Sequence, residues 1–190
     1  MLDLDSRELM CACRACSTLF DRGSVAGGGH FRLIPDRRLH IIDFEMSEMA
    51  WEQLRIPVDM AFFFHNSAAE RVGAFYPSPA GPTESQLELD AWDQIAVANS
   101  VLETMEHDVE ALLVNRSKGA NDHWLVPIED CYSLVAVIRT HWKGLSGGKE
   151  VWVEIASFFD DLDRRSKAVD KSGTKQKTNV AAPVGAAGGR

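Results

Sequence analysis

The chain has 190 residues, of which 45% are hydrophobic and 25% are charged, so it has an ordinary globular composition and the length of one domain with a substantial core. Its formal net charge of −8 argues against a nucleic-acid-binding protein, because phosphate binding usually requires a basic face. No apolar run approaches the roughly 20 residues of a transmembrane segment, and the acidic start MLDLDSRELM is unlike a secretory signal peptide. We therefore expect a cytoplasmic protein with reduced thiols.

Three of the four cysteines, Cys11, Cys13 and Cys16, fall within six positions. The stretch LMCACRACSTLFD alternates apolar and small residues around a Cys-x-x-Cys turn, and it predicts a strand–knuckle–strand hairpin over residues 1–22. Such a knuckle suits tetrahedral zinc, because the tight turn points two thiolates at one ion. On a strand the side chain of Cys11 would point the same way as that of Cys13. We therefore predict a structural metal site formed by these three cysteines, holding zinc or, alternatively, iron.

A closed structural site needs four ligands, and the chain has no second Cys-x-x-Cys pair. His30 and Cys131 are the intrachain candidates, but His30 is more simply a loop residue and Cys131 an apolar helix position. Two other interpretations of the cluster stay open. The thiols are either packed side chains of a reduced protein, or Cys13 and Cys16 form a redox pair in which Arg14 favours the thiolate. We place the redox pair below the metal, because redox pairs of the thioredoxin type lie at a strand-to-helix turn.

The order of strand and helix patterns over residues 30–168 predicts an α+β domain with an antiparallel sheet and helices mainly in its second half. The strands are predicted at HFRLIP, RLHIIDF, VDMAFFFHN, RVGAFYP, VEALLVN and HWLVPI. The prolines of PSPAGPTES predict a loop between them, which is a candidate binding edge. Helical spacing follows in LDAWDQIAVANSVLETM, IEDCYSLVAVIRTHWKGLSGG and KEVWVEIASFFDDLDRRSK. Residues 169–190 contain almost nothing to bury, and we expect a disordered basic tail there.

Motifs of the common enzyme classes are missing from the sequence. The six histidines form no His-x-x-x-His pair, SVAGGGHF is neither a dinucleotide fingerprint nor a P-loop, and no Gly-x-Ser-x-Gly elbow is present. The chain therefore offers no complete catalytic constellation, and we predict a protein that is not an enzyme.

Several stretches together resemble one bacterial family. They are LDLDSRELMCACRACSTLFD, GHFRLIPDR, LRIPVDMAFFFHNS, VGAFYPSPAGPTES, LDAWDQI, VEALLVNR and LVPIEDCYSLVAVIRTHWKG, which extend over about residues 2–160. The chain resembles an actinobacterial-type domain family of unknown function that is encoded beside nickel–iron hydrogenase genes. The resemblance implies an accessory protein that acts in hydrogenase maturation, assembly or subunit interaction, with a hydrogenase subunit or maturation protein as its partner.

The same resemblance implies a second cysteine pair upstream of Met1, which would complete a zinc-ribbon or rubredoxin-like site. The printed sequence lacks that pair, so its ligand set is incomplete. Two alternatives from other classes stay open: a rubredoxin-like iron electron-transfer protein and a thiol oxidoreductase.

Overall fold

The architecture is that of a computed structural model, which describes residues 1–20, 30–85, 89–144 and 147–175. The body is a seven-stranded sheet with the strand order β6-β5-β4-β7-β8-β3-β9. Neighbouring strands are antiparallel except β3 and β9, which are parallel. The strands are β3 (Leu39–Ile41), β4 (Met60–Asn66), β5 (Arg71–Ser78), β6 (Gly81–Ser85), β7 (Glu110–Asn115), β8 (Asp122–Pro127) and β9 (Lys167–Val169). The α+β prediction is confirmed.

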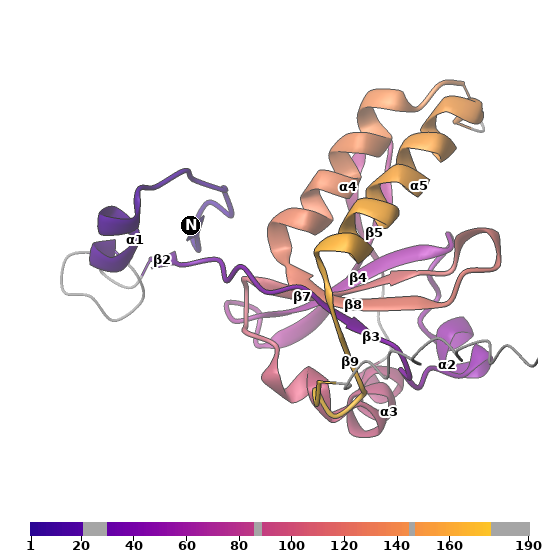
Figure 1. The fold of residues 1–190 in the computed structure, drawn as a ribbon, viewed down its shortest axis with the longest axis horizontal. Coiled ribbons are helices and arrows are strands. Elements are labelled where there is room, and N and C mark those ends of the chain that lie inside the picture. Colours follow the sequence, from indigo (N-terminus) through magenta and orange to yellow (C-terminus); the bar gives the residue numbers. More distant parts are fainter. Residues whose placement is uncertain (21–29, 86–88, 145–146, 176–190) are drawn as a thin grey trace, which may run out of the picture.

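Helices cover both faces of the sheet (Figure 1). One layer contains α4 (Ile128–His141) and α5 (Gly148–Arg165), and the other contains α2 (Glu48–Gln53), α3 (Leu89–Ala98) and the 3-10 helix η1 (Ser100–Thr104). A further 3-10 turn, η2 (Ser117–Gly119), joins β7 to β8. None of the described helices is long and apolar enough to cross a membrane.

The central strand β4 shows why the core has two halves. Its side chains alternate between the faces, so that Phe63 packs in the layer of α2 and α3, whereas Phe62 and Phe64 pack under α4 and α5. Both halves are apolar, which makes the run MAFFF continuously hydrophobic, as is typical of a strand buried on both sides. The helices predicted from the spacing of IEDCYSLVAVIRTHWKGLSGG and KEVWVEIASFFDDLDRRSK form as α4 and α5, each with a buried apolar face. These faces include Cys131, Leu134, Ile138, Val151, Ile155 and Leu162.

The loop predicted for the proline-rich segment is wrong, and the predicted start of the tail is corrected. The proline-rich segment forms the hairpin of β5 and β6, in which Pro77 lies opposite Pro82. Pro82 is tolerated because β6 is an edge strand, and Pro77 lies beyond Phe75, where the pairing of β5 with β4 ends. The predicted tail is ordered over residues 169–175: Val169 is buried in β9, and the Asp170 carboxylate accepts the N–H of Thr174 at 3.0 Å. The composition of residues 169–175 does not predict this order, because the segment is stabilised by backbone hydrogen bonds to β3 and η1. Residues 176–190 lie outside the described part.

The first residues form a small N-terminal lobe, by which we mean residues 1–20 and 30–33. Strand β1 (Leu2–Asp3) pairs with β2 (Phe31–Arg32), and the helix α1 (Arg14–Phe20) lies between them in sequence. Figure 1 shows these elements set to one side of the main sheet. The predicted cysteine-knuckle hairpin is therefore wrong: its second strand is a helix, because the Cys13 sulfur caps the first turn and Phe20 packs edge-on against Phe31. Residues 21–22 of that prediction lie outside the described residues.

Candidate functional site: a thiol pocket in the N-terminal lobe

The three clustered cysteines line one open cavity of about 540 Å³ in the N-terminal lobe. All three are exposed and carry free thiols. The structure therefore brings together the residues that the sequence singled out, although on a helix and a loop instead of a hairpin. We call this cavity the thiol pocket; its lining is Met1, Met10, Cys11, Ala12, Cys13, Cys16, Phe20 and Phe31.

Within the pocket, Cys13 and Cys16 form a hydrogen-bonded pair. Cys13 directly precedes α1, and its sulfur accepts the backbone N–H of Cys16 at 3.4 Å. This geometry follows from the spacing, because the side chain that caps a helix faces the N–H groups of the second and third helical residues.

The pKa values of the two thiols are shifted in opposite directions. Hydrogen bonds from the backbone N–H and then from the thiol of Cys16 hold the pKa of Cys13 below its ordinary value of 9.0. The bond to Cys13, and then the charge on its sulfur, raise the pKa of Cys16. The thiolate is the nucleophile in thiol chemistry, and the capping bond favours Cys13 over Cys16 as the thiolate of the pair.

The arrangement of the three cysteines does not match the predicted metal site. Within the described residues, no group of three or more cysteine, histidine, aspartate or glutamate side chains is arranged to hold a metal ion. The present arrangement of Cys11, Cys13 and Cys16 does not fit a closed four-ligand zinc or iron site. Their binding of zinc or iron stays a prediction.

The two remote candidates for a fourth ligand lie elsewhere. Cys131 is fully buried in α4, and burial raises the pKa of its thiol well above the ordinary value. The Nδ1 atom of His30 lies 2.8 Å from a carboxylate oxygen of Asp5, and His30 is not part of the pocket lining. Neither residue is therefore placed to complete a site at the three cysteines.

Arginines of the N-terminal lobe form ion pairs with residues next to the main sheet, and the sequence patterns did not predict these pairs. Arg7 Nη1 lies 3.0 Å from Oδ1 of Asp108, whose side chain is fully buried. Arg32 Nη2 lies 3.2 Å from Oε2 of Glu106. Burial alone would raise the pKa of Asp108, but hydrogen bonds from Ser67 and the charge of Arg7 outweigh it and lower that pKa. The lobe is thus held by ion pairs against a buried carboxylate.

The chain that leaves the lobe is fastened in the same way. Arg37 donates from Nε and Nη2 to the two carboxylate oxygens of the buried Glu110, both at 2.6 Å. Arg38 donates to both oxygens of the buried Asp130, at 2.6 and 3.1 Å. Bidentate pairs of this kind fix orientation as well as position. The closely spaced arginines of FRLIPDRR were the sequence signal, but their acidic partners are 73 and 92 residues away.

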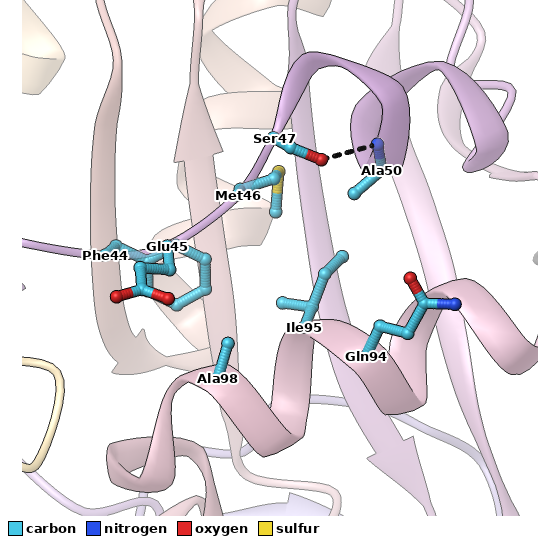
Figure 2. Close-up of a pocket in the computed structure, with 8 residues that line it drawn as sticks. All are labelled: Phe44, Glu45, Met46, Ser47, Ala50, Gln94, Ile95 and Ala98. Atoms are coloured by element: carbon cyan, nitrogen blue, oxygen red, sulfur yellow. Dashed lines mark hydrogen bonds between the residues drawn. The ribbon is translucent and has the colours of Figure 1, made fainter.

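A second cavity, of about 500 Å³, lies between residues 44–50 and α3 (Figure 2). Gln94, Ile95 and Ala98 of α3 form one wall. On the other wall, the Ser47 hydroxyl accepts the N–H of Ala50 at 3.1 Å and so caps α2, and Glu45 is paired with Lys171. The polar side chains of Glu45 and Ser47 therefore already have structural partners, and the thiol pocket, with its three cysteines, is the better candidate for chemistry.

Comparison with known proteins gives one family. Residues 1–166 match a family model described as a family of unknown function, DUF5947. A search of the curated proteins and a search of the solved structures give no match.

Proposed function

Starting from the fact that the chain belongs to the DUF5947 family, a family of unknown function, we propose that its thiol pocket carries out thiol–disulfide exchange with a partner protein. We further propose that the chain is an accessory protein of a nickel–iron hydrogenase system, which it assists in maturation or assembly. The exchange chemistry rests on the geometry of the pocket, and the biological setting rests on the resemblance of the sequence stretches quoted above.

The observation that carries the exchange chemistry is the capping bond, in which the Cys13 sulfur accepts the backbone N–H of Cys16 at 3.4 Å. The metal was preferred over the redox pair because a hairpin was expected around the cysteines. A helix follows Cys13 instead, and the Cys13 sulfur has the lowered pKa that the redox interpretation requires. The reason for placing the metal first is thus removed, because the expected hairpin does not form.

The exchange balances with no further reactant than the partner's disulfide. The Cys13 thiolate attacks one sulfur of that disulfide, a mixed disulfide forms, and the other partner sulfur leaves as a thiolate that takes up a proton. Cys16 then loses its proton and attacks the Cys13 sulfur. The Cys13–Cys16 disulfide forms and the second partner thiol is released. Two electrons pass from the protein to the partner disulfide; one proton comes from Cys16, and the other, which Cys13 had already released, comes from solvent.

Redox titration with mass spectrometry tests this proposal. The protein is equilibrated in buffers of defined reduced-to-oxidised dithiothreitol ratio, and its thiols are then alkylated. We expect a single reversible transition in which a Cys13–Cys16 disulfide forms, and no such transition in Cys13→Ser. Oxidation that joins Cys11 to either residue with equal yield, or no intramolecular disulfide at all, contradicts the proposal.

The hydrogenase setting is tested separately. The full chain, immobilised and reduced, is incubated with an extract of hydrogenase-producing cells. We expect recovery of a hydrogenase subunit or maturation protein. An extract from a strain deleted for the hydrogenase genes is the control, and recovery of the same proteins from both extracts contradicts this setting while leaving the exchange chemistry in place.

Metal binding is the second candidate, and one observation favours it: all three exposed thiols line a single cavity. Thiolates suit zinc and iron alike, so a structural zinc site and a rubredoxin-like electron carrier are both proposals of this kind. Elemental analysis of protein purified without chelators decides between them and the exchange chemistry. A stoichiometric metal that is lost in Cys13→Ser would support this candidate, and metal-free protein would remove it.

A further inference from the structure

Within the part of the chain that the structure describes, the side chains that line the thiol pocket are uncharged. Besides the three cysteines, the cavity is lined by five apolar side chains, those of Met1, Met10, Ala12, Phe20 and Phe31. A charged disulfide of low molecular weight, such as oxidised glutathione, carries carboxylates and ammonium groups that would lose water in this cavity. The described lining offers them no charged side chain, and the N-terminal ammonium of Met1 is already bonded to the Met10 carbonyl. Its lining therefore disfavours that class of substrate.

The lobe around the pocket exposes further apolar surface. Leu9, Met10, Leu19 and Leu33 are all large hydrophobic residues with 44% to 54% of their surface exposed. Methionine adapts its shape to varied apolar partners, and Met10 belongs both to this surface and to the lining of the pocket. Apolar side chains of a bound polypeptide would thus bury surface next to the reactive sulfur.

We infer that the substrate of the thiol pocket is a disulfide in a polypeptide segment whose cysteine is flanked by apolar side chains, and that Met10 helps to select it. This inference rests on the proposed exchange function and adds the substrate class. The backbone of Met10 is fixed independently of its side chain, because its N–H donates to the Met1 carbonyl at 2.8 Å and its carbonyl accepts the N-terminal ammonium at 2.9 Å. A substitution of the side chain therefore leaves the loop in place.

The test compares three disulfides under identical conditions. Two are capped, uncharged tripeptide disulfides, leucine–cysteine–leucine and serine–cysteine–serine, and the third is oxidised glutathione. The rate constant of each with the reduced full chain is measured by rapid acid quench and mass spectrometry. We expect the leucine-flanked disulfide to react at least about tenfold faster than the other two, which requires no more than the burial of about one leucine side chain.

Matched variants assign this preference to the pocket. Met10→Gln should lower the preference for the leucine-flanked disulfide by about threefold or more. Met49→Gln, the same change at an exposed methionine of α2 outside the pocket, should keep it. The rate of Cys13 alkylation by iodoacetamide should be equal in all three proteins, because this small neutral reagent needs no apolar docking.

The outcomes separate the two proposals. Similar rates for all three disulfides, or an unchanged preference in Met10→Gln, overturn the inferred substrate class and leave the exchange chemistry standing. Failure of all three disulfides to react, with Cys13 still alkylated by iodoacetamide, overturns the exchange function itself and the substrate class with it.

Discussion

Replacement of Glu110 by glutamine tests the arginine clamps that hold the N-terminal segment to the sheet. The Glu110 carboxylate is fully buried; it accepts two bonds from Arg37 at 2.6 Å and the N–H of Glu106 at 2.9 Å. Glutamine keeps the shape but removes the charge, and it presents an NH2 group where donors already point. A bond to a charged group contributes about 1.5–3 kcal/mol. Because Arg37 remains 37% exposed, solvent screens the pair, and we expect a loss of about 2–3 kcal/mol in total.

Urea unfolding followed by tryptophan fluorescence measures this loss, and thermal unfolding should show a Tm lowered by about 5–10 °C for a chain of this size. Glu84→Gln is the matched control, because Glu84 pairs with Arg71 at the surface, where the two side chains are 45% and 47% exposed. That variant should lose less than about 0.5 kcal/mol. Equal losses in the two variants would refute the reasoning that burial makes the Arg37–Glu110 pair a structural clamp.

Three further predictions follow from buried polar groups and thiols. Asn99→Ala should cost about 2–3 kcal/mol in urea unfolding, because the buried side chain bonds both the N–H and the carbonyl of Glu45; an unchanged midpoint would contradict this. The folded-state pKa of Asp108 is lowered from 3.8, so the stability that it contributes is present above that value and lost as the pH falls below it. Asp108→Asn should therefore show a weaker fall in unfolding free energy between pH 5 and 3, and an identical fall would be the contrary result. Ellman titration of the native protein should leave the thiol of Cys131 unreacted until denaturant is added; its reaction in native protein would argue against its burial.

Much of the body could be predicted from local patterns. The period of the apolar residues in KEVWVEIASFFDDLDRRSK placed Val151, Ile155 and Leu162 on the buried stripe of α5, as the structure shows. The run MAFFF likewise marked β4. These elements follow the sequence because burial against one or two layers selects the same period that the backbone geometry imposes.

Long-range contacts account for the errors. The predicted long helix through Asn99 breaks there, because the Asn99 side chain bonds the backbone of Glu45, 54 residues away. The proline-rich segment is a hairpin because Pro77 and Pro82 lie on the last two strands of the sheet, which sequence alone does not order. Both are cases in which tertiary contacts outweigh local propensity.

The sequence identified the cysteines of the candidate site but not their arrangement. The spacing singled out Cys11, Cys13 and Cys16, and they do line one cavity. A short stretch of small residues around Cys-x-x-Cys is compatible with a knuckle or with a helical turn, and only the capping bond to the Cys13 sulfur distinguishes them. The apolar walls were not predictable, because Phe31 comes from a strand on the far side of residues 21–29 in sequence.

Trapping of the mixed disulfide tests the central claim most directly. Cys16→Ser removes the second attack, so a reduced variant mixed with the leucine-flanked tripeptide disulfide should accumulate a covalent adduct on Cys13, visible as a mass increase and mapped by proteolysis. Cys13→Ser should give no stable adduct at position 16, and the unaltered protein should release both peptide thiols and end as a Cys13–Cys16 disulfide. An adduct that forms equally on Cys11, or that persists unresolved in the unaltered protein, would contradict the account.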